Sequence, residues 1–212
     1  MAPIDVAPRP LPPMVAQAQR AAKAAEFAMS CTDRTGAMLR ALAASKPGGR
    51  LLELGTGTGV GTAWLLAGMD PDARLITVEA DPVRCAVARG VIMGDRRVSL
   101  HCGDAAEWLT TVAGAPFDLV FVDCRPGKFS HRAELFARLA PGALYVVDDL
   151  LPQPTWPEDH QQRVDRFLTE IHAEPALVCT AMHWNSGLLL GARKPEPERQ
   201  RAWHGTTPSN RG

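Results

Sequence analysis

Cysteine is scarce in this 212-residue sequence, and its pattern excludes the common cysteine-based architectures. The five cysteines are widely scattered and form no CxxC pair. An odd number without pairing indicates free thiols in a reducing compartment, so we expect a cytoplasmic protein rather than a disulfide framework. The six histidines show no HxxxH or HExxH spacing, which excludes a structural zinc site.

The sequence also lacks an excess of charge of either sign and any long apolar run. Its 23 Lys and Arg balance 23 Asp and Glu, whereas proteins held mainly by nucleic-acid phosphates usually carry a basic excess. Apolar stretches reach about eight residues, against the roughly 20 of a membrane span. The proline-rich segment 1–13 has no apolar stretch typical of a signal peptide. We therefore expect no nucleic-acid partner and no membrane partner.

What is present is enough apolar sequence, 46%, to bury the core of one domain. We expect residues 1–13 to be disordered, a single domain over 14–194, and a mobile tail over 195–212. Two helices are predicted over 14–45, the first with an alanine-rich apolar stripe at positions 14, 18, 21, 25 and 28. Such a stripe permits close packing, either on the domain itself or on a second copy in a homodimer.

The rest of the domain alternates between apolar strands and helices. The predicted strands are 50–55, 74–80, 97–102, 117–123 and 143–149, and the helices between them are 58–68, one starting at Asp81-Pro82, 105–112 and 129–139. Thr155 and Glu158 have capping-box spacing ahead of a further helix that runs to about 172. Strands 176–184 and 187–194 follow without a helix between them. This order predicts an α/β fold with a Rossmann-like doubly wound sheet, mostly parallel, with an antiparallel terminal hairpin and an N-terminal helical extension.

Ligands bind such sheets beyond the carboxyl ends of the strands. The first strand ends in Glu53, followed by the glycine-rich turn 55–59, whose residues are Gly55, Thr56, Gly57, Thr58 and Gly59. Val60 stands where the dinucleotide fingerprint needs glycine, and no P-loop lysine follows. Since a carboxylate inside an apolar strand is costly without a donor, Glu53 indicates a polar ligand.

The next two strands also end in carboxylates. Glu79 is placed to accept both hydroxyls of a ribose, whereas Asp81 is better interpreted as the N-cap before Pro82. Asp104 is placed to accept from an adenine amino group, although Asp104 and Glu107 also have the spacing of a helix start.

Over roughly residues 28–193, these features resemble the class I S-adenosylmethionine-dependent methyltransferases. The pattern at 117–123, the Leu-Ala-Pro-Gly at 139–142 and the Asp-Asp that ends strand 143–149 look like the small catechol and caffeoyl-coenzyme A O-methyltransferases. The resemblance implies S-adenosylmethionine as cofactor and a segment at 30–36 that closes over it. It implies cofactor-binding roles for Glu53, Gly55, Thr56, Gly57, Thr58, Gly59, Glu79, Ala80, Asp104, Ala105 and Asp123.

The same resemblance implies a metal site. In metal-dependent relatives, carboxylates after the fourth and fifth strands hold Mg²⁺, and a lysine acts as base. The matching residues are Asp123, Asp148 and Asp149, with Mn²⁺ or Ca²⁺ as other oxygen-preferring ions. The sequence departs from the family in having Asp-Asp for Asp-Asn and a lysine, Lys128, five residues after Asp123 rather than three. The alternatives are that Lys128 is an exposed turn residue and that only one of the paired aspartates faces the cleft.

We therefore predict methyl transfer to a hydroxyl oxygen of a small molecule, such as a phenol, with Lys128 and Asp123 as catalytic residues. Trp156 lies where the family builds its acceptor pocket, either stacking on a planar acceptor or packing a lid. The alternatives are a metal-independent N- or O-methyltransferase with Lys128 or His131 near the acceptor, a nicotinamide-dependent oxidoreductase, and a cofactor-binding protein without catalysis.

Overall fold

A computed structural model of the chain describes residues 10–153 and 156–195. Its elements in chain order are α1 (Pro13–Ala24), α2 (Asp33–Ala44), β1 (Arg50–Leu54), α3 (Val60–Gly68), β2 (Arg74–Glu79), α4 (Pro82–Ile92), β3 (Val98–Cys102), α5 (Ala105–Thr111), β4 (Phe117–Val122), α6 (Arg132–Phe136), β5 (Leu139–Val147), α7 (His160–His172), β6 (Leu177–Met182) and β7 (Leu188–Arg193). The predictions for 1–9, for Thr155 and for the tail from 196 fall outside the described residues.

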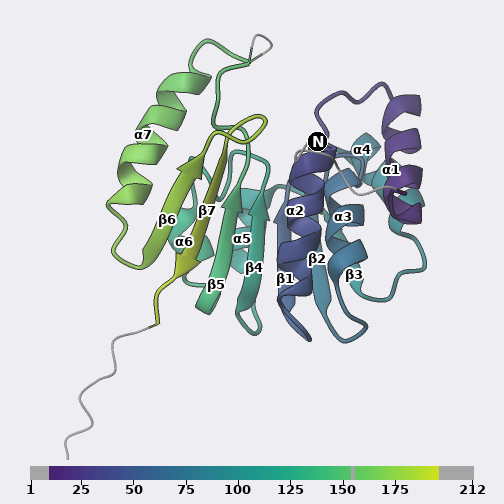
Figure 1. The fold of residues 1–212 in the computed structure, drawn as a ribbon, viewed down its shortest axis with the longest axis horizontal. Coiled ribbons are helices and arrows are strands. Elements are labelled where there is room, and N and C mark those ends of the chain that lie inside the picture. Colours follow the sequence, from purple (N-terminus) through teal and green to yellow (C-terminus); the bar gives the residue numbers. More distant parts are fainter. Residues whose placement is uncertain (1–9, 154–155, 196–212) are drawn as a thin grey trace, which may run out of the picture.

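The strands form one seven-stranded sheet in the order β3-β2-β1-β4-β5-β7-β6 (Figure 1). Strands β1 to β5 pair in parallel, and β7 pairs antiparallel with both β5 and β6. The predicted fold class is therefore confirmed. The chain leaves β1 toward β2 on one side and reaches β4 on the other, so the order reverses between β1 and β4, where such sheets bind ligands.

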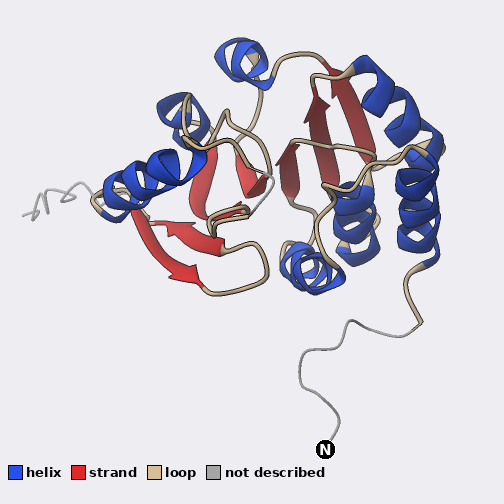
Figure 2. Ribbon diagram, turned by 90° about the horizontal axis from the view of Figure 1, so that it is seen from above, coloured by secondary structure: helices blue, strands red, loops and turns tan. Residues whose placement is uncertain are grey.

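Helices cover both faces of the sheet, as the view from above shows (Figure 2). One core lies between the sheet and α1 to α4 and is centred on Trp64, which is fully buried. The other lies between the sheet and α5 to α7, and includes Phe117, Tyr145 and Phe167. Neighbouring strand residues such as Leu51 and Leu52 point to opposite cores, as the pleat of a doubly covered sheet requires.

Helix α1 packs on α3 and α4 of the same chain. Its fully packed positions are Val15, Ala18 and Ala22, so the buried face is turned slightly from the predicted stripe. The helix also ends at Ala24, which leaves positions 25 and 28 outside it. The alternative in which this helix mediates a homodimer stays a prediction.

Three predicted boundaries are wrong. Helix α6 is confined to Arg132–Phe136, and α7 begins at His160, beyond Pro157, because a proline disfavours helical backbone at the residue before it. Strand β5 begins at Leu139 rather than 143, because Pro141-Gly142 lies in an irregularity of its pairing with β4. All five cysteines are free thiols. Within the described ranges, every helix is too short or too polar to cross a membrane.

Candidate active site

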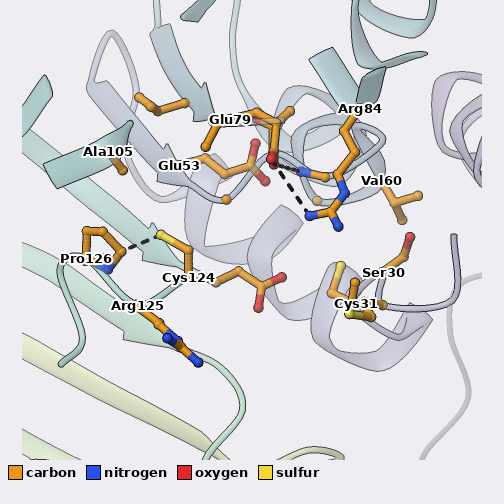
Figure 3. A pocket seen from close by; sticks show the side chains of 18 of the residues that line it. Ser30, Cys31, Glu53, Val60, Glu79, Arg84, Ala105, Cys124, Arg125 and Pro126 are labelled. Carbon is orange, nitrogen blue, oxygen red and sulfur yellow. Dashed lines mark hydrogen bonds and ion pairs between the residues drawn. The ribbon is translucent and has the colours of Figure 1, made fainter. Parts of the chain in front are cut away.

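A cavity of about 360 Å³ lies at the carboxyl ends of β1, β2 and β4, under the segment that joins α1 to α2 (Figure 3). Most of the residues predicted to bind a cofactor line it: Glu53, Gly55, Thr56, Gly57, Glu79, Ala80, Asp104, Ala105 and Asp123. Thr58 and Gly59 are outside the lining. They directly precede α3, with Gly59 as its N-cap.

The turn after β1 needs its glycines for two reasons. Gly55 has φ +94°, and a Cβ there would lie 2.5 Å from the carbonyl oxygen of Asp123. Gly57 has φ +55°, and a Cβ there would lie 3.0 Å from the ring of Phe27. Both positions are in the left-handed region that favours glycine. The turn can therefore pass close to a ligand without side chains in between.

Glu79 fixes this turn from the neighbouring strand. Its carboxylate accepts hydrogen bonds from the backbone N–H of Gly57 (2.8 Å) and of Asp81 (3.0 Å), and Arg84 lies 3.9 Å from it. A carboxylate has about four acceptor positions. Glu79, which is 7% exposed, can thus shape the turn and still accept from a ligand.

The aspartates beyond β2 and β3 are helix N-caps. Asp81 accepts from the backbone N–H of Val83 and Arg84, which confirms the predicted cap. Asp104 accepts from the N–H of Ala106 (2.6 Å) and Glu107 (3.2 Å) through Oδ1 and also lines the cavity. Because both capping bonds use Oδ1, the other carboxylate oxygen of Asp104 is left to contact a ligand.

Glu53 is fully buried beneath the cavity. Its Oε2 accepts from Thr62 Oγ1 and from Thr77 Oγ1 (2.6 Å), the latter directly opposite it on β2. Its Oε1 has no hydrogen-bond partner among the described residues, although the residue lines the cavity. Burial raises the pKa of Glu53 from 4.5 to about 7. An unpaired carboxylate oxygen at this depth is suited to a cationic ligand group.

Glu53→Gln should make the ligand-free protein less sensitive to pH. Because the pKa is raised in the folded state, the wild-type carboxyl stabilises the fold below pH 4.5, and this contribution is lost as pH rises through about 7. This lost contribution to the free energy of unfolding amounts to about 3 kcal/mol. Urea unfolding at pH 5 and pH 8 should show a smaller pH difference for the variant. Equal pH dependence in both proteins would contradict the burial of a titrating Glu53.

Several lining residues were missed or only loosely placed from the sequence. Segment 27–31 crosses the cavity, and the Ser30 hydroxyl is buried there without a partner in the described part of the chain. Arg84 reaches over from α4, with its guanidinium carbon 5.0 Å from the centre of the Phe27 ring. No local sequence signal joins Phe27 to Arg84, because only tertiary packing brings them together.

The three carboxylates predicted to bind metal lie at one edge of the sheet, with Lys128 beside them. Asp123 and Asp149 line the cavity, whereas Asp148 is 3% exposed and turns away. Asp148 Oδ1 accepts from Ser186 Oγ (2.5 Å) and from the N–H of Asp149 (2.8 Å). Thus only one of the paired aspartates faces the cleft, which was the alternative interpretation of the pair.

Lys128 is not an exposed turn residue. It is 2% exposed, and its ammonium donates to the backbone carbonyl of Asp148 (3.0 Å). Burial, with Asp148 and Asp149 nearby, raises the pKa of Asp123 well above its ordinary value, and Lys128 opposes this shift. Burial likewise raises the pKa of Asp148 to about 6. The buried ammonium therefore compensates part of the negative charge.

This arrangement does not fit the predicted ligand set for a metal. Nowhere in residues 10–153 and 156–195 do three His, Cys, Asp or Glu side chains gather closely enough to hold an ion. Asp148, one of the predicted ligands, already has an oxygen engaged by Ser186. The magnesium site stays a prediction from the sequence.

Other candidate side chains lie away from the cavity. His131 is outside its lining and contacts Ser130. Trp156 packs against His160, with ring centres 3.9 Å apart and ring planes tilted by 46°, and His160 contacts the carbonyl of Asp149. Trp184 packs against the core under Arg34, and His183 is exposed. These positions favour packing for Trp156 and Trp184.

Comparison with known proteins agrees with this fold. A family model described as a methyltransferase domain matches residues 52–150. A catechol O-methyltransferase of Mycobacterium tuberculosis is 37% identical over 145 residues, which cover 66% of each chain. A probable O-methyltransferase of the same organism is 40% identical over 121 residues, or 55% of this chain and 54% of that protein. The chain thus spans about half to two thirds of these relatives.

Among solved structures, the O-methyltransferase TomG of Streptomyces achromogenes in complex with SAM has a TM-score of 0.77 and 25% identity, over 87% of this chain and 91% of that one. The sheet order, the glycine-rich turn and the family match define one class of protein. The chain belongs to the class I S-adenosylmethionine-dependent methyltransferases. Within that class it is similar to the small O-methyltransferases.

Proposed function

We propose that the protein is an enzyme that transfers a methyl group from S-adenosylmethionine to a hydroxyl oxygen of a small molecule, such as a phenol. The main support for this proposal is the cavity at the end of β1. It holds two buried polar atoms that lack hydrogen-bond partners in the described residues, Glu53 Oε1 and Ser30 Oγ. A zwitterionic amino acid group offers both a cation for the former and an anion for the latter. The names of the relatives support oxygen as the acceptor atom.

We assign each part of the cofactor to the cavity residues by their position. Glu53, Ser30 and the turn at Gly55, Thr56 and Gly57 would hold the methionine part. Glu79 and Ala80 would hold the ribose, and Asp104 and Ala105 the adenine. Asp123 would lie nearest the reacting end. When bound, this cofactor supplies a methyl group activated by a sulfonium charge.

Methyl transfer of this kind is an in-line displacement, so the chain contributes mainly alignment and removal of a proton. Asp123 and Asp149 face the cavity beyond the turn. We assign acceptance of the hydroxyl proton to Asp123, whose raised pKa makes it a stronger base than an ordinary carboxylate. Lys128 lies outside the cavity lining, so its proposed role changes from base to charge compensation.

Calorimetry with S-adenosylmethionine and with NAD tests the cofactor, and a panel of catechols and phenols tests the transfer. We expect binding of S-adenosylmethionine only, and a methylated product with its methyl on oxygen. Binding of NAD alone would overturn the proposal in favour of an oxidoreductase. Tight binding of S-adenosylmethionine without turnover of any acceptor would favour a cofactor-binding protein without catalysis.

The metal-assisted version of the reaction is tested in the same assay. Loss of turnover in excess chelator, with recovery in Mg²⁺ or Mn²⁺, would support a metal despite the arrangement of the carboxylates. Unchanged turnover would support a metal-independent enzyme in which Lys128 supplies the positive charge. Neither outcome affects the proposed cofactor.

A further inference from the structure

The turn 183–187 between β6 and β7 contacts the chain on both sides of the cavity. On one side it meets the start of α2, directly after the cavity-lining residues Ser30 and Cys31. On the other side it meets the loop 148–151 after β5, which carries the cavity-lining Asp149. It is about 150 residues from the first partner in sequence and about 38 from the second. The turn is therefore a bridge between two walls that the sequence keeps apart.

Asn185 makes the contacts with the start of α2. Its Nδ2 donates to Thr32 Oγ1 (2.6 Å) and to Thr35 Oγ1 (3.1 Å), and its Oδ1 accepts from Arg34 (3.5 Å). Thr32 is also the N-cap of α2, where its hydroxyl accepts from the N–H of Thr35. One amide side chain thus engages both threonine hydroxyls of the cap and the arginine between them.

The residues after Asn185 make the contacts with the other wall. Ser186 Oγ donates to Asp148 Oδ1 (2.5 Å), and the carbonyls of Ser186 and Gly187 accept from the N–H groups of Leu151 (2.6 Å) and Leu150 (3.1 Å). A Cβ on Gly187 would lie 2.6 Å from the nitrogen of Leu151. The turn is packed against this loop without space for adjustment.

The backbone at Asn185 explains why this residue type is needed. Its φ is +49°, a conformation that asparagine tolerates better than most residues. Glycine would accept the backbone but would lose the amide. Aspartate would keep the shape, could accept from both threonine hydroxyls and would pair with Arg34.

From this bridge we infer that Asn185 is a positioning residue. It holds segment 30–32 over the cofactor side of the cavity and, through Ser186, couples it to the loop at Asp148 and Asp149 on the acceptor side. The inference rests on the proposed function for the names of the two sides, but the coupling is a property of the free protein. Removal of the contacts at either end of turn 183–187 should therefore increase local opening both at the start of α2 and in loop 148–151.

Hydrogen exchange of the ligand-free protein tests the coupling independently of any activity. Asn185→Gly should speed exchange at least about tenfold at Thr35, the N–H bonded to the cap, and also at Asp149, Leu150 and Leu151. Ser186→Ala should do the same from the other end, and Asn185→Asp should restore slow exchange. The matched control is His183→Ala, because His183 is exposed in the same turn.

Binding and kinetics provide the second readout. Asn185→Gly should weaken the binding of S-adenosylmethionine about five- to tenfold and raise the KM for the acceptor. Asn185→Asp should recover both constants, and the two variants should have similar melting temperatures. Exchange that rises only on the side of the substituted residue would overturn the coupling. Additive effects on exchange in the double variant Asn185→Gly/Ser186→Ala would also overturn it, since the effects of coupled contacts are not additive. If the wild type binds no S-adenosylmethionine, the proposed function fails, while the exchange experiment still decides the coupling.

Discussion

Gly57→Val is expected to leave a folded protein that has lost at least about 100-fold in affinity for S-adenosylmethionine. The φ of +55° disfavours a β-branched residue, and its Cβ would lie 3.0 Å from the Phe27 ring in the cavity. The strain costs about 1–3 kcal/mol of stability. It also displaces the N–H that donates to Glu79, so the turn and the ribose side are disturbed together.

Gly48→Val is the matched control for this experiment. Gly48 has a similar φ of +65°, but a Cβ there meets nothing within 4 Å. Calorimetry should show normal binding for Gly48→Val, and circular dichroism should show that both variants fold. If Gly57→Val binds within threefold of the wild type, the turn at 55–59 does not carry the cofactor.

Lys128→Met is expected to lower kcat about 100-fold at neutral pH, with S-adenosylmethionine binding changed by less than threefold. Without the buried ammonium, the pKa values of Asp123 and Asp148 rise further, so the carboxylates are increasingly protonated at neutral pH. The acidic limb of the pH–rate profile should therefore move to higher pH. Initial rates between pH 6 and pH 9 measure both effects.

Two further variants separate the possible roles of Lys128. Lys128→Arg keeps the charge and should recover much of the rate, whereas recovery would be absent if Lys128 had to accept the proton itself. Lys46→Met is a control, because the Lys46 ammonium also donates to a backbone carbonyl, that of Gly142 (3.1 Å), but near the start of β5. A kcat for Lys128→Met within threefold of the wild type would contradict the compensating role.

The sequence predicts most of this fold because its signals are local. Apolar runs mark β1, β2 and β4, and Asp81-Pro82 marks the start of α4, since capping depends only on adjacent residues. The start of β5 was missed because Pro141-Gly142 resembles a turn, whereas pairing with β4 continues around it. The start of α7 was missed because Thr155 and Glu158 have the spacing of a capping box, although Pro157 lies between them.

For the site, the sequence predicts which chain segments meet but not how their side chains turn. Carboxylates at the ends of parallel strands must share one sheet edge, so Asp123 and Asp149 were placed there in advance. Whether Lys128 would be buried and whether Asp148 would turn to Ser186 depends on packing across 20 and 38 residues. Asn185 carried no local signal, because its partners lie about 150 residues earlier.

The position of β7 sets the order in which the molecule can be completed during synthesis. Strand β7 lies between β5 and β6 although it is the last strand made. Until Arg193 has been synthesised, β5 is an open sheet edge and β6 has no partner, and unpaired edges of this kind favour association with other chains. The N-terminal half can assemble around β1 earlier, as the leading part of a nascent chain generally does. A chain that ends before residue 188 would thus contain β1 to β5 but leave the edge of β5 unpaired and open to association with other chains.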